Sequence, residues 1–331
     1  MKKFADKFIF PCAIGILLLS AFLSLRFGSV TLTSEQFWKG LFGMDGYKTQ
    51  TLIIRSSRLP RLFGGIVAGM GLALAGTLLQ RVTDNPLAAP NLLGINAGAG
   101  FSVLLLLVFA PSLSALLPLS AFIGALLTSL LILGIARMNG MGKTAIVLTG
   151  VALSALFQAG ISFLSKLDPD ALVSYTDFSI GGLYGLKTSE LLVPSVIVLV
   201  CFVLSLFLAK ELSLFCLGDT LAISLGVNVK KVRLLALILA SASAAAAVSF
   251  AGLIGFVGLI VPHVARKIVV GNARKELLLS PLLGASLLLL ADLLARTAFA
   301  PTEIPVGVFT ALLGVPFFLI LVLKRRNHVS M

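Results

Sequence analysis

Long stretches without a charged residue dominate this chain. No Asp, Glu, Lys or Arg occurs from Asn85 to Ala136, a run long enough for two membrane-crossing helices of about 20 residues each. These stretches are continuously apolar, whereas the strands of a membrane barrel alternate apolar and polar positions. With a mean hydropathy of +1.09 and only 12% charged residues, the pattern excludes an ordinary soluble domain. It predicts an all-α polytopic membrane protein.

Apolar windows between charges and prolines predict about ten membrane helices in a single transmembrane domain that covers residues 1–331. No charge separates the seventh window from the eighth, and we expect the three glycines of Ser249–Gly258 to form the turn between them. An even number of crossings places both chain ends on one side. The predicted windows are Phe8–Leu25, Leu62–Leu79, Leu92–Phe109, Leu117–Ile135, Ala145–Leu164, Leu191–Leu208, Leu234–Phe250, Leu253–Val270, Leu277–Leu294 and Val306–Leu323.

The net charge of +13 would suggest a nucleic-acid partner in a soluble protein. In a membrane protein it is better explained by the excess of Lys and Arg in cytoplasmic loops. With both termini in the cytoplasm, seventeen Lys and Arg residues lie inside and nine outside. We therefore expect both termini to be cytoplasmic and expect no nucleic-acid partner. The nine outer cations need a different explanation.

No motif in the sequence predicts catalysis by this chain. Gly142-Lys143-Thr144 resembles the end of a phosphate-binding loop, but Arg137 stands where the first glycine of that loop would be. The three cysteines lack the paired spacing of a metal site. We expect no catalytic residue, no metal site and no cofactor bound by this chain.

A short amphipathic helix is predicted in the cytoplasmic segment of about residues 211–229. Leu217, Leu221 and Leu225 are spaced at i, i+4 and i+8, so they form one apolar stripe, and Gly226 can end the helix. Such a helix lies at the lipid interface or docks into the groove of a partner protein. The stripe alone leaves both alternatives open.

Asp292 lies inside an apolar window, where an acid is expensive and is usually paired. Arg296 follows one helical turn later and is the simplest partner. A structural ion pair is the default interpretation. The alternative, a proton-coupling carboxylate, would favour a secondary transporter driven by an ion gradient. A channel is a further rival, but no selectivity motif is visible.

Four motifs, in this order along the chain, resemble the permease family of ATP-driven importers for ferric siderophores, haem and cobalamin. The motifs are Arg58-Leu-Pro-Arg61, Asn85-Pro-Leu-Ala88, Gly252–Arg266 and Ala291-Asp292-x-x-Ala295-Arg296.

The resemblance implies a subunit of the bacterial cytoplasmic membrane that pairs with an identical or closely related permease around one path across the lipid bilayer. It also implies two cytoplasmic ATPase subunits, which use ATP and Mg, and an extracytoplasmic substrate-binding protein. A ferric siderophore is the implied cargo, with haem or cobalamin as alternatives.

The resemblance further assigns three sets of residues. Those implied to dock the binding protein through its glutamates are Arg58, Arg61 and Arg296, and Arg296 has Asp292 as its other candidate partner. Those implied to form the cytoplasmic gate are Asn85, Leu87, Lys143 and Thr144, of which Lys143 departs from the family pattern. Those implied to contact the ATPase are Leu217, Gly218, Asp219, Leu221, Leu225 and Gly226.

Overall fold

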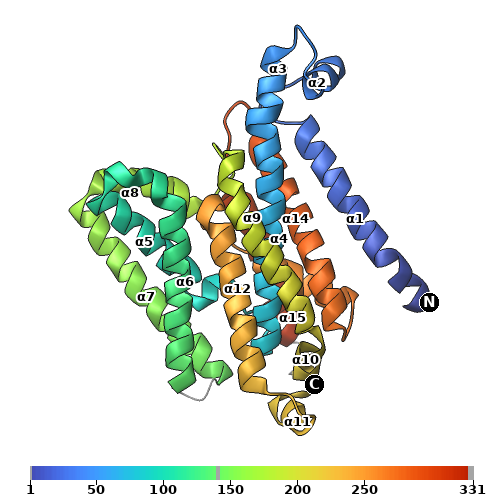
Figure 1. Ribbon diagram of the computed structural model, residues 1–331, viewed down its shortest axis with the longest axis vertical. Coiled ribbons are helices and arrows are strands. Elements are labelled where there is room, and N and C mark those ends of the chain that lie inside the picture. The colour runs from blue at the N-terminus through green and yellow to red at the C-terminus, as the bar shows by residue number, and fades with distance from the viewer. Residues whose placement is uncertain (1, 139–141, 327–331) are drawn as a thin grey trace.

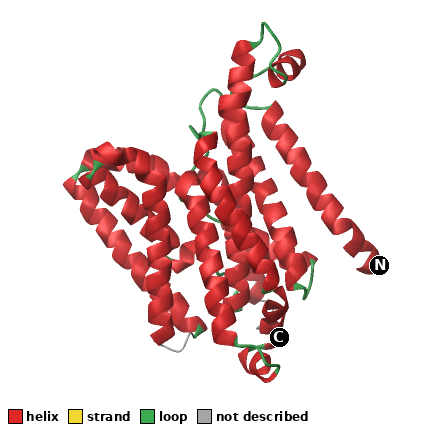
Figure 2. Ribbon diagram, viewed as in Figure 1, coloured by secondary structure: helices red, strands yellow, loops and turns green. Residues whose placement is uncertain are grey.

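A computed structural model describes residues 2–138 and 142–326, and every regular element in these ranges is a helix (Figures 1 and 2). The long helices run side by side, which confirms the all-α membrane fold. The elements are α1 Lys2–Arg26, α2 Ser34–Leu41, α3 Lys48–Ile53, η1 Ile54–Arg58, α4 Leu59–Thr83, η2 Pro90–Leu93, α5 Ile95–Phe109, η3 Pro111–Leu116, α6 Leu117–Met138, α7 Lys143–Leu167, α8 Pro169–Ile180, α9 Thr188–Phe207, α10 Ala209–Leu214, η4 Phe215–Leu217, α11 Asp219–Ser224, α12 Val229–Ala251, α13 Val257–Ile268, α14 Ala273–Thr297 and α15 Val306–Arg326.

Helix α4 is the central element of the bundle (Figure 1). Pro60 is the second residue of α4, directly after the π-helical turn η1, and α3, η1 and α4 follow one another as a single helical span, Lys48–Thr83. Asp84 follows the last turn of α4 in the left-handed conformation, with φ of 49°, and ends the helix. Its 25 residues correspond to about 37 Å, enough to cross the hydrocarbon core. The two ends of α4 therefore lie at opposite ends of the molecule.

Small residues allow α4 to lie unusually close to its neighbours. A side chain at Gly69 would collide with the backbone of Gly284 in α14, and one at Gly76 would collide with the backbone of Gly258 in α13. Where lipid gives helices no hydrophobic reason to associate, such close backbone contact supplies much of the attraction. The glycines of this window are therefore packing residues.

Seven helices are long and apolar enough to cross a membrane, and two shorter apolar helices, Ile95–Phe109 and Val306–Leu321, accompany them within the described part of the chain. All ten predicted windows fall on helices, but two of those helices are shorter than expected. The window Leu92–Phe109 begins with a separate 3-10 turn, η2, and its α-helix starts only at Ile95. The ten crossings and the side of the membrane that each end faces remain predictions.

The window Leu253–Val270 contains only the 12 residues of α13, about 18 Å of helix. The expected turn within Ser249–Gly258 is present but lies late, because α12 continues to Ala251. Gly252 and Phe256 then both take positive φ values, 70° and 64°, and this irregular backbone delays the start of α13.

The outer layer of the bundle is largely uncovered. Only 17% of the apolar window of α1 and of α7 is buried, compared with 78% of the window that contains α4. Helices α5 to α8 form one side of the molecule and α1 the other, and both described chain ends lie in the half that carries α11 (Figure 1). At the opposite end α2 and α3 project beyond α1. The uncovered apolar faces of α1 and α7 suit lipid or a second subunit.

Replacing Gly69 by Ala should destabilise the protein by about 1–3 kcal/mol, because the added methyl group forces α4 away from Gly284. Gly134→Ala is the matched control: nothing lies within 4 Å of its added carbon, and Ala is the better helix former by about 0.5–1 kcal/mol. Thermal unfolding in detergent should show a lower Tm for Gly69→Ala and an unchanged or higher Tm for Gly134→Ala. Equal Tm values would contradict the packing of α4.

Candidate functional site

The end of the bundle at which α4 begins is called the outer end, because it is predicted to face outward. It holds the three arginines that were predicted to dock a binding protein. Arg58 is only 2% exposed. Its guanidinium donates to the carbonyl oxygens of Leu25 and Arg26, both at 2.7 Å, and of Val30 at 2.6 Å. Because these carbonyls belong to the end of α1 and the turn after it, Arg58 fastens α1 to the start of α4.

Arg296 and Asp292 form an ion pair inside α14, with Nε and Oδ2 3.1 Å apart. Nη2 of Arg296 also donates to the carbonyl oxygen and to Oγ of Ser24 in α1, both at 2.7 Å. Both charged side chains are almost fully buried, so the pairing compensates much of the cost of removing them from water. The expected pairing of Asp292 with Arg296 is present.

Arg61 has a more accessible partner. Its Nη2 lies 2.6 Å from Oε2 of Glu303, in the segment between α14 and α15, and its Nη1 lies 3.9 Å from Oδ1 of Asp292. The guanidinium also faces the ring of Tyr184, whose centroid is 5.5 Å away. These charged groups line a cavity of about 740 Å³ at the outer end.

The three outer arginines are thus close to one another in the fold but are not exposed. Each one donates to acceptors of the chain itself. An unpaired buried cation would be costly, so each of these guanidinium groups is paired within the chain. Their docking role stays a prediction.

The predicted gate residues lie at the opposite end of α4, which is called the inner end because it is predicted to face the cytoplasm. Oδ1 of Asn85 accepts from the backbone N–H of Leu87 at 3.0 Å, which shapes the break after α4. Lys143 and Thr144 begin α7. Nζ of Lys143 lies 3.6 Å from Oδ2 of Asp84, so the two predicted gate segments are side by side.

The predicted coupling segment is not one continuous helix. Gly218, with φ of 91°, separates the 3-10 turn η4 from α11, so Leu217 lies outside the helix that carries Leu221. The expectation of a single helix across Leu217–Gly226 was therefore wrong. The three leucines are nevertheless exposed by 51% at Leu217, 55% at Leu221 and 60% at Leu225. The three leucines therefore still form part of an exposed apolar surface, although they do not share one helix.

Asp219 joins the coupling segment to the gate. Both of its carboxylate oxygens accept from Nη2 of Arg233 in α12, at 2.8 Å each. Nζ of Lys143 lies 3.9 Å from Oδ1 of Asp219. Arg233 also donates to the carbonyl oxygen of Val82 at the end of α4. A chain of ionic contacts therefore leads from α11 to α7, α12 and the break after α4.

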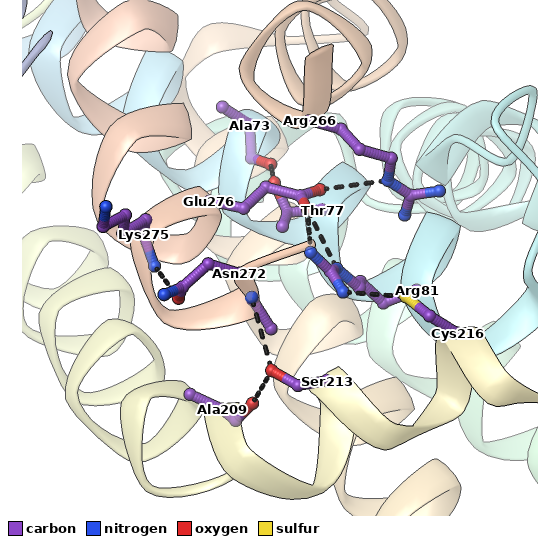
Figure 3. Close-up of polar contacts among 11 residues, drawn as sticks. Ala73, Thr77, Arg81, Ala209, Ser213, Cys216, Arg266, Asn272, Lys275 and Glu276 are labelled. Carbon is purple, nitrogen blue, oxygen red and sulfur yellow. Dashed lines mark hydrogen bonds and ion pairs between the residues drawn. The ribbon is translucent and has the colours of Figure 1, made fainter. Parts of the chain in front are cut away.

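A second inner cluster was not predicted from the sequence (Figure 3). Nε of Arg81 in α4 donates to Oε2 of Glu276 in α14 at 2.9 Å, and both side chains are almost fully buried. Arg266 of α13 lies 3.5 Å from Oε1 of Glu276. Nη1 of Arg81 donates to Sγ of Cys216 at 3.2 Å, which links this cluster to η4. No local signal pairs Arg81 with Glu276, because 195 positions separate them.

The bundle of long apolar helices is that of a multi-pass membrane protein, and the polar clusters at its two ends suit a permease. The model of the FecCD transport family matches residues 16–324, and the chain therefore belongs to the FecCD transport family.

Relatives agree with this assignment. The chain is 39% identical over 321 residues to the hemin transport system permease of Yersinia pestis, covering 95% of each. It is 36% identical over 307 residues to an Fe(3+)-citrate import system permease of Bacillus subtilis, covering 92% of each. A solved ABC transporter assigned to the metal-chelate type, in an inward-facing conformation, matches with a TM-score of 0.84 and 32% identity, over 96% of this chain and 99% of that one. The chain is thus a membrane translocation subunit of the ABC type.

Glu276→Gln should lower the free energy of unfolding by about 3 kcal/mol, because Arg81 would keep a buried charge without its carboxylate. Glu190→Gln, at an exposed position near the start of α9, is the matched control and should have little effect. Thermal unfolding in detergent compares the two. A Glu276→Gln protein as stable as the control would show that the cluster is not structural.

Proposed function

We propose that the chain is the permease subunit of an ATP-driven, binding-protein-dependent importer of ferric siderophores in the bacterial cytoplasmic membrane. The observation that carries the proposal is the contact of Asp219 with both Arg233 and Lys143. It connects an exposed apolar segment, suited to a cytoplasmic partner, with the predicted exit gate.

The coupling segment fits a groove in an ATPase subunit better than a place in lipid. Its exposed leucines stand beside an ionic cluster, and movement of α11 would pull on Lys143 and Arg233 through Asp219. Two cytoplasmic ATPase subunits would bind ATP and Mg and supply that movement. This chain would bind no cofactor and carry out no covalent step.

A second permease, identical or paralogous, would cover the uncovered face of α7. Gln158 lies near the middle of α7 and its side chain is exposed in the single chain. A polar amide facing lipid lacks hydrogen-bond partners, so such groups favour helix–helix contacts or a hydrated path. The face around Gln158 is thus the best candidate for the subunit interface or for the path itself.

The cargo class follows from the relatives, which are named for Fe(3+)-citrate, siderophore, hydroxamate and hemin transport. We propose a ferric siderophore for this chain, with haem or cobalamin as the alternative cargoes. All three are large, so we expect a wide path with few strong contacts.

The arrangement around Asp292 weakens the rival proposal of an ion-driven secondary transporter. Its carboxylate lies next to two cations, Arg296 and Arg61, and is almost fully buried. A coupling carboxylate must gain and release its ion during transport. The contacts with the two arginines instead favour a structural, ion-paired Asp292.

Reconstitution into liposomes tests the proposal as a whole. Uptake of a radiolabelled ferric siderophore should require the ATPase subunits, ATP and the loaded binding protein. The chain reconstituted alone should give no uptake on a proton or sodium gradient. Ion-driven uptake by the chain alone would refute the importer, and ATP-driven uptake of haem or cobalamin but not of the siderophore would refute only the cargo.

The link through Asp219 is tested by Asp219→Asn and Lys143→Met. Each should lower the amount of cargo moved per ATP hydrolysed by about ten-fold, which corresponds to a coupling loss of about 1.4 kcal/mol. Lys230→Met is the matched control, because Lys230 is exposed at the same end of the molecule. If both variants transport as efficiently as the control, Asp219 does not connect the ATPase to the gate.

A further inference from the structure

Four charged groups at the outer cavity pair with one another: the cations Arg61 and Arg296 and the anions Asp292 and Glu303. Asp177 is a further acid in the lining of the cavity. Asp292 and Arg296 form its buried part, with side chains that are 2% and 3% exposed. Glu303 is its accessible member, with a side chain that is 24% exposed. Because both cations are already paired and Asp177 adds a negative charge, the cavity as folded offers little net attraction to an acidic partner.

Only one of the three outer arginines has a partner suited to exchange. Arg58 donates to backbone carbonyls at the end of α1, and Arg296 donates to Ser24 besides pairing with Asp292. Releasing either contact set would break the hydrogen bonds that hold the end of α1 to α4 and α14. Arg61 instead pairs with a side chain at the cavity mouth, which can be replaced without unfastening a helix.

Glu303 can leave Arg61 without rearrangement of its segment. The backbone on either side is held, because the N–H of Thr302 donates to Phe299 at 3.0 Å and the N–H of Ile304 donates to Ala295 at 2.9 Å. Rotation of the Glu303 side chain alone would free Nη2 of Arg61.

The guanidinium of Arg61 would keep its place when Glu303 rotates away. The carboxylate of Asp292 lies 3.9 Å from its Nη1, and the ring of Tyr184 lies beside it. These groups compensate part of the charge and hold the guanidinium toward the cavity. An incoming carboxylate would then find an oriented cation, which suits bidentate binding.

We propose that Glu303 is an exchangeable internal partner of Arg61, and that an acidic side chain of the extracytoplasmic binding protein displaces it from Arg61 when the binding protein docks at this cavity. The inference rests on the proposed function. One carboxylate replaces another, so the buried charges stay balanced throughout. The unbound permease thereby avoids an unpaired cation at its outer end.

The test measures binding of the importer's own chelate-loaded binding protein to the complete transporter in nanodiscs, by biolayer interferometry. Glu303→Gln should lower Kd by about five-fold or more, because a competing charge is removed from Arg61. Arg61→Gln should raise Kd. In the double variant, Glu303→Gln should no longer improve binding. Glu190→Gln, which removes a negative charge elsewhere at the outer end, should change Kd much less.

The outcomes distinguish docking at Arg61 from the displacement of Glu303. If Arg61→Gln weakens binding but Glu303→Gln does not strengthen it, Glu303 is not an exchangeable occupant, although docking at Arg61 stands. If Kd responds to neither residue, the receiving site and the docking assignment of Arg61 both fail. Glu303→Asp retains the charge and should bind like the wild type, and unchanged Tm values exclude misfolding as the cause of any loss.

Discussion

Pairing of buried charges between α4 and α14 is the constraint on which the rest of the bundle depends. At the inner end Arg81 is paired with Glu276, and at the outer end Arg61 faces Asp292. Breaking a buried pair leaves a charge that low-polarity surroundings cannot stabilise. Between the two ends, Gly69 and Gly284 bring the backbones into contact. The two helices are thus fixed at both ends and in the middle, and we infer that they move as one rigid unit.

The segments that can move relative to this unit lie at its inner end. Lys143 contacts Asp84 and Asp219 at 3.6 and 3.9 Å, and all three side chains are partly exposed. Ion pairs that water reaches contribute little stability, so they can exchange partners at small cost. The inner segments can therefore change their contacts during transport, whereas α4 and α14 keep their positions relative to each other.

The sequence predicted the membrane-helix windows well because each depends on local hydropathy. It failed where the backbone conformation of single residues determines where a helix breaks or begins. Gly218 interrupts the coupling segment, and Phe256 takes a positive φ that its side chain does not favour, so α13 starts late. The cluster of Arg81 and Glu276 was missed because hydropathy patterns carry no information about pairs far apart in the chain. The burial of Arg58 and Arg61 was missed for the same reason, since their acceptors lie in distant segments.

The rigid α4–α14 unit is tested most directly by hydrogen–deuterium exchange of the assembled transporter with and without bound ATP. Our account predicts that amides within 62–79 and 277–295 exchange at the same slow rate in both states. It predicts altered exchange in the inner segments 84–94, 142–146 and 209–226. A change in the middle of α4 or α14, with the inner segments unaffected, would contradict it.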